Sequence, residues 1–416
     1  MKSFTVFIAL LCFSNYWGQI AETISFTYEE GKTKMLKENV RLMAEYYNLD
    51  IAEAEIQQQR LWENPLFVWN AEMYNLAENN YFNFGNQKLL QIEYSFSVSG
   101  KRINAIKEAK VAKDIAALAL SDVIRALVLE YSNAFYELIE LREMNELLNE
   151  ASSQYDKLIE QYTLGNELGV NSESELIRLK AERQSILADI NENDKEVLAL
   201  ELNLKMLLNY PASIKLNPLK NLIAMNPDIT ENKLIELADA NRPDLLIAKK
   251  NISLYQATLK KEKSQIIPNI NLGYQPHDQG SNHVRPYVGM VFEMGIPVFN
   301  RNQGNVAKAK IQIDQSSMLL RYKTEEVKNE VVMAKESFLR ALELKNSFNL
   351  ELIDKMDTLS KDAKINYERK NISLYEYIDF QRSYIDNKLN YIQANRKFNE
   401  AINLLNFNVG IDLKNL

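Results

Sequence analysis

The stretch LQIEYSFSVSGKRINAIKEAK, residues 90–110, changes its pattern at Gly100. Before this glycine, apolar and polar residues alternate, which is the two-residue period of a β-strand. After it the alternation is gone, and neither glycine nor proline occurs from Lys101 to Leu164, which favours one long helix. The stretch MVFEMGIPVFNRNQGNVAKAK, residues 290–310, makes the same change over the same length. The chain therefore contains the transition from strand to helix twice.

The similarity extends well beyond these two stretches. Pro65 and Pro268 each stand just ahead of a strand pattern, and Thr27 and Thr230 each lie 38 residues before the respective proline. We therefore expect two structural repeats, each running helix, strand, loop, strand, long helix, tip, helix. They are predicted at 21–210 and 230–416, with a proline-rich joint at 211–229. The strands are predicted at 66–76, 88–98, 269–275 and 286–298, and the later helices of the repeats at 101–163, 172–209, 305–366 and 375–409.

Composition narrows the class of protein. The 416 residues carry a net charge of -7, one cysteine and two histidines, which excludes a disulfide scaffold or a His/Cys metal cage and argues against a nucleic-acid partner. Lys2 and the apolar run from Phe4 to Phe13 predict a signal peptide over residues 1–20. Leu11 is too bulky for a usual lipid-attachment motif, so we do not expect Cys12 to carry a lipid. No other apolar run is long enough for a transmembrane helix.

Each predicted strand has one apolar face and is about the length that a tilted strand needs to cross an outer membrane. A soluble hairpin over a core would have a similar local pattern. Four strands alone cannot close a barrel without leaving edges unpaired in lipid, so a membrane location requires further copies of the chain. The candidate lipid-facing residues are Phe67, Trp69, Met73, Ile92, Tyr94, Phe96, Met290, Phe292 and Met294.

No combination of residues predicts catalysis. Serine, histidine and aspartate are scattered, and no glycine-rich phosphate loop joins a strand to a helix. His277, Asp278 and His283 could approach a metal ion, but we interpret them as part of a solvated surface loop. We therefore predict no enzyme activity, no cofactor and no metal site.

Four segments, in order, carry a resemblance to a known family. They are RPDLLIAKKNISLYQATLKKEKSQIIPNINLGY (242–274), GIPVFNRNQGNVAKAK (295–310), YTLGNELGVNSESELIRLKAE (162–182) and YERKNISLYEYIDFQRSYID (367–386). Across the whole mature chain the sequence resembles the TolC-type outer membrane efflux proteins, also called outer membrane factors. The resemblance implies a mainly helical protomer of two coiled-coil repeats and four strands. It also implies a homotrimer whose twelve-stranded β-barrel in the outer membrane continues as a helical tunnel in the periplasm.

The resemblance further implies function and partners. Proteins of this kind are passive exit ducts of tripartite efflux or type I secretion systems, and a periplasmic adaptor (membrane fusion) protein and an inner-membrane pump complete the assembly. Outer-membrane lipid would surround the barrel. The alternative that the residues leave open is a secreted or periplasmic coiled-coil scaffold without a pore, which would explain the helices but not the placement of the four strands.

Three groups of tip residues take their roles from the resemblance alone. The family narrows its periplasmic mouth with acidic rings, which match Glu376, Asp379 and Asp386. A latch between the tips matches Glu175 and Tyr367, although Ile372 stands where a basic residue is often found. The adaptor would contact Gly165, Leu168, Gly169, Leu374 and Tyr375.

Overall fold

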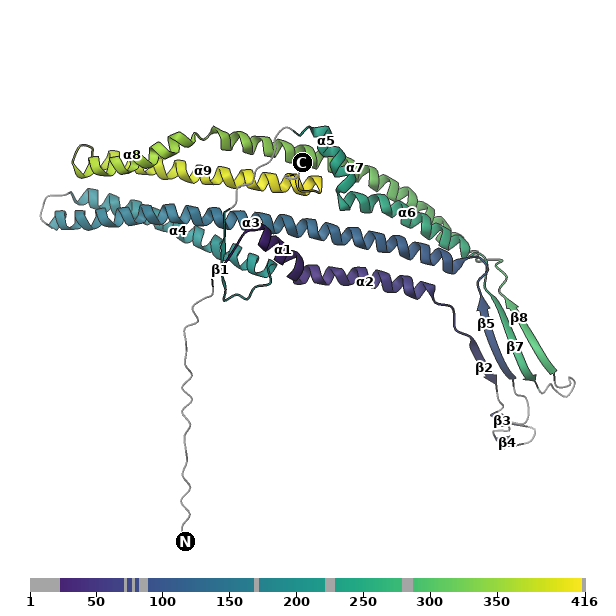
Figure 1. Ribbon diagram of the computed structural model, residues 1–416. Helices are drawn as coiled ribbons and strands as arrows, with labels where there is room; N and C mark the ends of the chain where they lie inside the picture. The colour runs from purple at the N-terminus through teal and green to yellow at the C-terminus, as the bar shows by residue number, and fades with distance from the viewer. Residues whose placement is uncertain are drawn as a thin grey trace, which may run out of the picture. The chain divides into compact units, whose positions relative to one another are not determined.

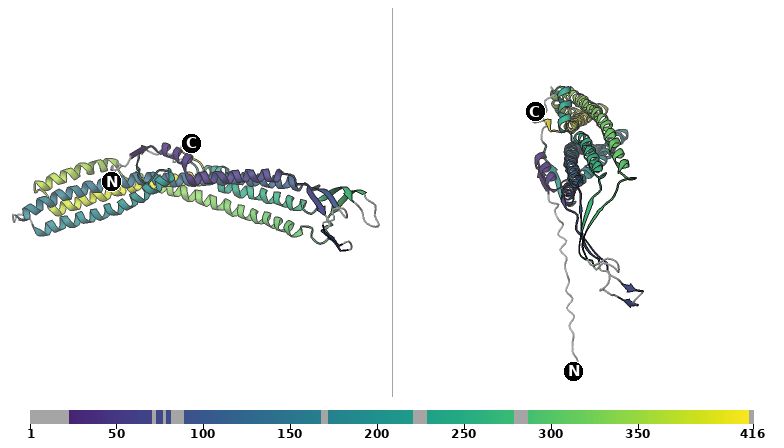
Figure 2. Two further views of the ribbon diagram at one scale, coloured as in Figure 1. Left: turned by 90° about the horizontal axis from the view of Figure 1, so that it is seen from below. Right: turned by 90° about the vertical axis from the view of Figure 1, so that its right-hand side faces the viewer.

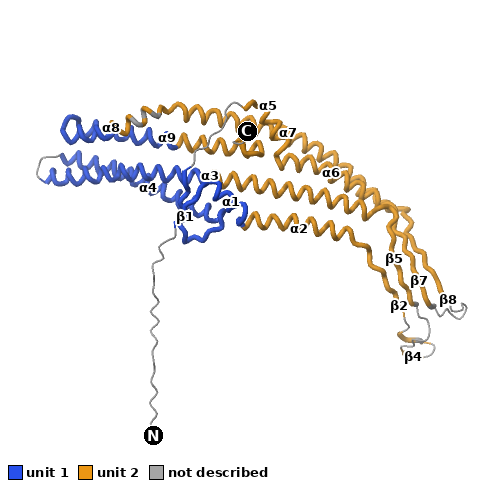
Figure 3. The backbone as a smooth tube through the Cα atoms, viewed as in Figure 1, with its two compact units in different colours: residues 1–39, 134–222, 360–392 blue, residues 40–133, 223–359, 393–416 orange. Residues whose placement is uncertain are grey.

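The computed structural model describes residues 23–70, 73–76, 79–81, 89–167, 172–220, 229–278 and 287–413. The predicted signal peptide lies outside these residues. The chain divides into two compact units (Figure 3). Unit 1 comprises residues 1–39, 134–222 and 360–392, and unit 2 comprises residues 40–133, 223–359 and 393–416.

Unit 2 contains the helices α2 (Val40–Arg60), α5 (Glu231–Asn241), α6 (Pro243–Ser264) and α7 (Gln303–Ser347), together with parts of α3 (Lys101–Glu167), α8 (Leu350–Glu368) and α9 (Leu374–Val409). Helices α6 and α7 lie side by side (Figures 1 and 2). The buried positions of α7 recur at spacings of four and three, as in other packed long helices, at Val327, Val331, Ala334 and Phe338. No helix in the described ranges is long and apolar enough to cross a membrane.

Unit 2 also contains a four-stranded antiparallel sheet. Its strands are β2 (Leu66–Asn70), β5 (Leu89–Phe96), β7 (Ile270–Asp278) and β8 (Tyr287–Met294), in the order β2-β5-β7-β8. The strand expected at 66–76 ends at Asn70, because its partner β5 begins at Leu89 directly opposite. Met73, predicted to lie in that strand, is instead in a bend before the short ladder of β3 (Tyr74–Asn75) and β4 (Asn80–Tyr81).

The turns from strand to helix are fixed by capping of the neighbouring helix ends. Gly100 has φ +75°, a left-handed conformation that glycine adopts without steric cost, and α3 begins at the next residue. The hydroxyl of Ser99 donates to the carbonyl oxygen of Ser264 at 2.6 Å, and the side-chain amide of Asn302 donates to that of Glu262 at 2.9 Å. The residues just before α3 and α7 therefore bind carbonyl groups in the last turn of α6, where the oxygen of Glu262 also accepts the N–H of Gln265 at 3.3 Å.

Unit 1 contains α1 (Tyr28–Glu38), α4 (Glu173–Leu207), the parallel pair β1 (Thr23–Phe26) and β6 (Lys215–Pro218), and the tip ends of α3, α8 and α9. The helix expected at 305–366 is divided into α7 and α8. Phe348 has an extended backbone (φ -78°, ψ 115°), and the carbonyl oxygen of Asn349 accepts the N–H of Ile353 at 3.1 Å to start the second helix. This break has neither glycine nor proline to mark it in the sequence.

The last helices of the two repeats end in the same way. Asn209 follows α4 with φ 55°, and Gly410 follows α9 with φ 84°. In unit 1, the side chain of Asn39 donates to the carbonyl oxygen of Leu207 at 2.9 Å. In unit 2, Arg242 donates to the carbonyl oxygen of Asn408 at 3.4 Å. A polar side chain at the start of a helix thus caps the end of another in each repeat.

Replacing Gly410 with alanine is expected to destabilise the protein by about 2 kcal/mol, because an added Cβ is unfavourable at positive φ. The added Cβ would also lie only 3.1 Å from the backbone carbonyl carbon of Asn241. The matched control is Gly304→Ala in the first turn of α7, where an added Cβ meets nothing within 4 Å. The control should be neutral or stabilising by up to about 1 kcal/mol. Denaturation midpoints of both variants, measured at equal protein concentration, would test this; equal midpoints would contradict it.

Candidate functional site

The sheet of unit 2 has one apolar and one polar face. The strand register aligns Ile92, Tyr274 and Met290 in one row, and Tyr94, Leu272 and Phe292 in the next. Most of this face is exposed; the side chain of Phe292, for example, is 65% accessible. Leu272 and Tyr274 were not among the predicted lipid-facing residues, although their alternation in the sequence indicates the same face. Of the predicted set, only Met73 lies outside the sheet.

The opposite face carries a ladder of polar side chains. Gln275 donates to the side-chain oxygen of Gln91 at 3.0 Å, and Gln91 donates to Glu93 at 3.1 Å. Gly273 leaves the space that Gln91 fills, because an added Cβ there would lie 2.9 Å from the Gln91 amide nitrogen. These hydrogen bonds link neighbouring polar side chains along this face.

Among the strands of the described ranges, β2 and β8 each pair with a single neighbour, so each leaves one edge of the sheet open. An open edge presents N–H and C=O groups that another strand can satisfy. The sequence pattern predicted a strand that ends at residue 275, but β7 extends to Asp278, which pairs with Leu89 of β5. His277 and Asp278, expected in a loop, therefore belong to this strand, while His283 lies outside the described residues. Within the described part of the chain, no group of three His, Cys, Asp or Glu residues could hold a metal ion.

A tyrosine cluster joins the tips of unit 1. The hydroxyl of Tyr367 in α8 donates a hydrogen bond to that of Tyr162 in α3, and the ring of Tyr367 also stacks on Tyr377 of α9 at 5.0 Å between centroids. Burial raises the pKa of the Tyr367 hydroxyl, and so does its bond with Tyr162, followed by the charge of Glu175. The tyrosines are therefore neutral across the physiological range.

The structure brings the two predicted latch residues into one region but gives Tyr367 a different hydrogen-bond partner. Glu175 accepts the backbone N–H of Ser172 at 3.4 Å, at the start of α4, and it acts on Tyr367 through its charge. Tyr162 was not predicted. The repeat contained the signal for it, since Tyr162 opens the first tip segment as Tyr367 opens the second.

The three predicted aperture residues lie on α9. Glu376 completes the cap of this helix: its carboxylate accepts both the backbone N–H and the hydroxyl of Ser373 at 2.8 Å. The backbone bond, and then the hydroxyl bond, lower the pKa of Glu376. Asp379 and Asp386 are exposed on one face of the helix, seven residues apart.

A basic residue that the sequence did not single out divides this acidic face. Arg382 donates from Nε to Glu182 of α4 at 3.0 Å, and its pKa is raised by that hydrogen bond and by the charge of Glu182. Asp386 adds a smaller effect in the same direction. The face of α9 between Asp379 and Asp386 therefore has mixed charge.

The predicted adaptor contacts do not share one environment. Leu374 is only 5% exposed and belongs to the apolar core of the tips, so it contributes to packing and not to the surface. Tyr375 is exposed, with the guanidinium of Arg178 over its ring at 4.8 Å. Gly165 lies in the last turn of α3, and Leu168 and Gly169 lie outside the described residues.

Solved structures match the chain over most of its length. A membrane protein from Pseudomonas aeruginosa matches with a TM-score of 0.75 at 17% identity, covering 93% of this chain and 91% of that one. The outer membrane protein VceC from Vibrio cholerae matches with a TM-score of 0.72 at 14% identity, covering 93% of this chain and 96% of that one. The outer membrane channel CmeC from Campylobacter jejuni matches with a TM-score of 0.73 at 15% identity, covering 92% of this chain and 85% of that one.

No protein-family model and no curated protein sequence matches the chain. The structural likeness, at identities this low, concerns the fold. It agrees with the prediction of a mainly helical chain with four antiparallel strands. The chain therefore has the fold of the TolC-type outer-membrane channels.

Proposed function

We propose that the protein is a passive exit duct through the outer membrane, the outermost component of a tripartite efflux or type I secretion system. The observation that carries this proposal is the sheet, which has an exposed apolar face, a polar face and two open edges, and which continues directly into long helices. An open edge is too costly in lipid to persist. Three copies of the chain would pair these edges in a closed twelve-stranded barrel, with the helices in the periplasm.

In such a barrel the apolar faces contact lipid and the polar ladder lines the lumen. The chain would supply the path, while an inner-membrane pump supplies the energy and a periplasmic adaptor joins the two. The exposed surface around Gly165 and Tyr375 at the tips is the proposed adaptor contact. This function requires no catalytic residue in the duct.

The test is single-channel conductance of the detergent-extracted protein in a planar bilayer, with its mass measured on the same sample by native mass spectrometry. A trimer that gives small, mostly closed openings is the expected result. A water-soluble species that never inserts would contradict the duct and favour the coiled-coil scaffold.

The exposed carboxylates of α9 are proposed to give the periplasmic mouth its ion preference. Three copies of Asp379 and Asp386 around one axis would favour cations in the mouth, with Glu376 adding charge from its capping position. Replacing Asp379 and Asp386 together with asparagine should lower the ratio of cation to anion permeability severalfold. Reversal potentials in a salt gradient measure this ratio. The control is Asp189→Asn, which removes charge from an exposed site on α4. An equal change of the permeability ratio in this control would show that the carboxylates of α9 do not line the mouth.

The tyrosine cluster is proposed to hold the tips closed. Tyr162→Phe removes the hydroxyl that accepts from Tyr367 and leaves the ring contacts, so closure should weaken by about 1 kcal/mol per protomer. The expected result is a higher open probability in single-channel records, by roughly fivefold or more for a trimer. Tyr375→Phe, at an exposed ring, is the matched control. An unchanged open probability in Tyr162→Phe would mean that the cluster stabilises the tips without gating them.

A further inference from the structure

Basic residues gather where the helices of unit 2 meet the sheet. Four segments form this region, residues 58–63, 99–110, 258–265 and 299–310, which we call the basic collar. They comprise the ends of α2 and α6 and the starts of α3 and α7, which lie together beside the strands in Figure 1. The collar has eleven basic residues and only three acidic ones, although the net charge of the whole chain is -7. Its charge is therefore opposite to that of the protein as a whole.

Most of the collar's cations have no carboxylate partner. Within the described residues, one cation of the collar forms an ion pair. The ammonium group of Lys261 lies 2.6 Å from the carboxylate of Glu108, which also belongs to the collar. Farther along the helices of unit 2, lysines are paired; Lys250, for example, contacts Asp114 at 2.8 Å. The collar's positive charge is therefore available to a partner.

Large apolar side chains are exposed among these cations. Trp62 is 67% exposed and Phe299 92% exposed, and Ile103 and Ile296 also face outward. The guanidinium of Arg102 lies 3.7 Å from the centre of the Trp62 ring. Exposed aromatic rings beside Lys and Arg, next to an apolar surface, are typical of the boundary between a membrane and water.

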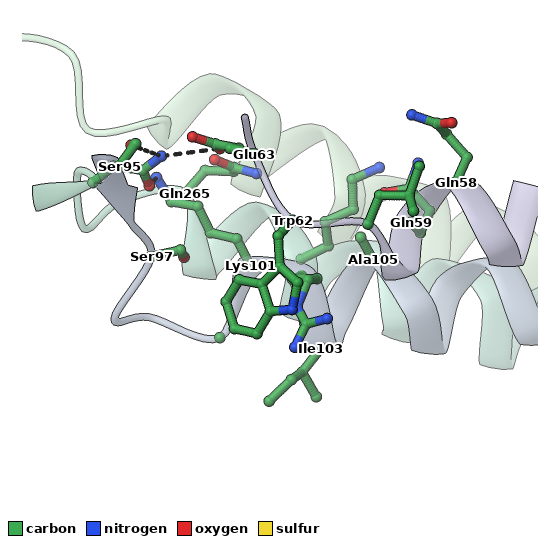
Figure 4. Close-up of a pocket in the computed structure, with 15 residues that line it drawn as sticks. Gln58, Gln59, Trp62, Glu63, Ser95, Ser97, Lys101, Ile103, Ala105 and Gln265 are labelled. Carbon is green, nitrogen blue, oxygen red and sulfur yellow. Dashed lines mark hydrogen bonds between the residues drawn. The ribbon is translucent and has the colours of Figure 1, made fainter. Parts of the chain in front are cut away.

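The collar contains a pocket of about 390 Å³ (Figure 4). Its cations are Lys101, Arg102 and Lys261, and its carboxylate is that of Glu63. The ammonium group of Lys101 donates to Asn269 at 2.8 Å, which leaves it further donors. The hydroxyl of Ser97 also lines the pocket, and Trp62 contributes an apolar wall. Ser95 also lines the pocket and shares the row of Asn271 and Glu293, so the pocket lies on the polar face of the sheet and is not a lipid site.

We propose that the exposed cations of the basic collar bind the headgroup phosphate of anionic phospholipids. The inference rests on the proposed function, because it needs the apolar face of the sheet to lie in lipid. The collar would then meet the periplasmic leaflet, where the phosphates neutralise its cations and hold the barrel at a fixed depth. Each Lys or Arg near an anionic membrane surface strengthens the association of a protein with that membrane by roughly fivefold.

The experiment measures association of the detergent-extracted protein with two kinds of vesicle, phosphatidylcholine alone and phosphatidylcholine mixed with phosphatidylglycerol. Four exposed collar lysines that form no ion pair within the described residues are changed together, as K107Q, K110Q, K308Q and K310Q. A second variant, K101Q with R102Q, removes two cations of the pocket on the polar face and should keep the lipid preference. The matched control removes four exposed basic residues from unit 1, as K157Q, K180Q, K361Q and R369Q.

The expected result is a preference of the wild type for the anionic vesicles that falls about tenfold or more in the fourfold collar variant and persists in the control. The fourfold collar variant should also retain fewer phosphatidylglycerol molecules in native mass spectrometry, and the pocket variant should retain as many as the wild type. Failure of every variant and of the wild type to enter either vesicle would contradict the duct itself.

Other results would overturn the collar alone. These are equal insertion of the wild type into both vesicles, an equal loss in the control, or displacement of the retained lipid by inorganic phosphate, which would indicate a simple anion site. A fourfold collar variant with altered ion selectivity and unchanged lipid preference would place the collar in the lumen, and would also overturn the inference.

Discussion

Replacement of Arg242 with methionine is expected to destabilise the protein by about 3–5 kcal/mol, the usual consequence of removing one partner from a buried ion pair. Arg242 is only 2% exposed. Its guanidinium contacts Asp244 through two bonds, at 3.0 and 2.6 Å, and Glu330 at 2.6 Å. The variant would leave the partly buried carboxylates of Asp244 and Glu330, 17% and 35% exposed, with fewer partners.

The network around Arg242 joins several helices of unit 2. Asp244 of α6 also accepts from Lys323 of α7 at 2.9 Å and lies 3.6 Å from Arg125 of α3. Arg125 in turn donates to the carbonyl oxygen of Phe407, near the end of α9, at 2.8 Å. Loss of Arg242 therefore weakens the contacts of α6 with α7 and uncaps the end of α9.

Denaturant midpoints of the detergent-extracted protein at a fixed concentration measure this effect. Arg340→Met is the control, because Arg340 is exposed on α7 in the same unit; it should change stability by less than about 0.5 kcal/mol. A midpoint for the Arg242 variant within the error of the control would show that the network is dispensable.

Lowering the pH should reduce the difference in stability between the wild type and the Arg242 variant. Burial alone would raise the pKa of the Asp244 carboxyl, but hydrogen bonds from Arg242 and Lys323 outweigh burial and hold this pKa below its usual range. A carboxylate with a lowered pKa in the folded state contributes stability above its unfolded pKa of about 3.9 and loses it as the pH falls further. The two midpoints should therefore converge below about pH 4.

The sequence allowed the fold to be predicted because both kinds of element have a strong period. Strands such as 90–98 alternate strictly, and long runs without glycine or proline indicate long helices. The ends of these elements depend on partners instead. β2 ends where β5 begins, and the division at Phe348 and Asn349 has no marker in the sequence.

The candidate site was harder to predict than the fold, because roles at the tips depend on which side of a helix is buried. Leu374 and Tyr375 are neighbours in the sequence, yet one is buried and the other exposed. The partners of Arg242 come from α6, α7 and α9, so the sequence could place this arginine at a helix start without showing what it binds. Tyr162 matches Tyr367 in the repeat of the sequence, but only the folded structure shows that their hydroxyls form a hydrogen bond.

Phe292→Arg is expected to prevent normal assembly, at a cost of about 2–4 kcal/mol per protomer if the residue lies near the middle of the bilayer. Phe292 lies on the apolar face, on the outer strand β8, in the row of Tyr94 and Leu272. Its neighbour Glu293 belongs to the opposite face, so Glu293→Arg places the same side chain one residue away, in the proposed lumen. We expect this second variant to assemble normally and to alter only ion selectivity.

The measurement is the yield of heat-resistant trimers in the membrane fraction, compared at equal expression. Three substitutions per trimer would multiply the penalty, so little assembled Phe292→Arg protein should remain. Because the two positions are adjacent and receive the same side chain, failure of Phe292→Arg alone would indicate that its face of the sheet contacts lipid, even though Glu293→Arg changes the charge more. Equal yields of trimer would show that the apolar face does not contact lipid, and the exposed aromatic residues would then require a protein partner.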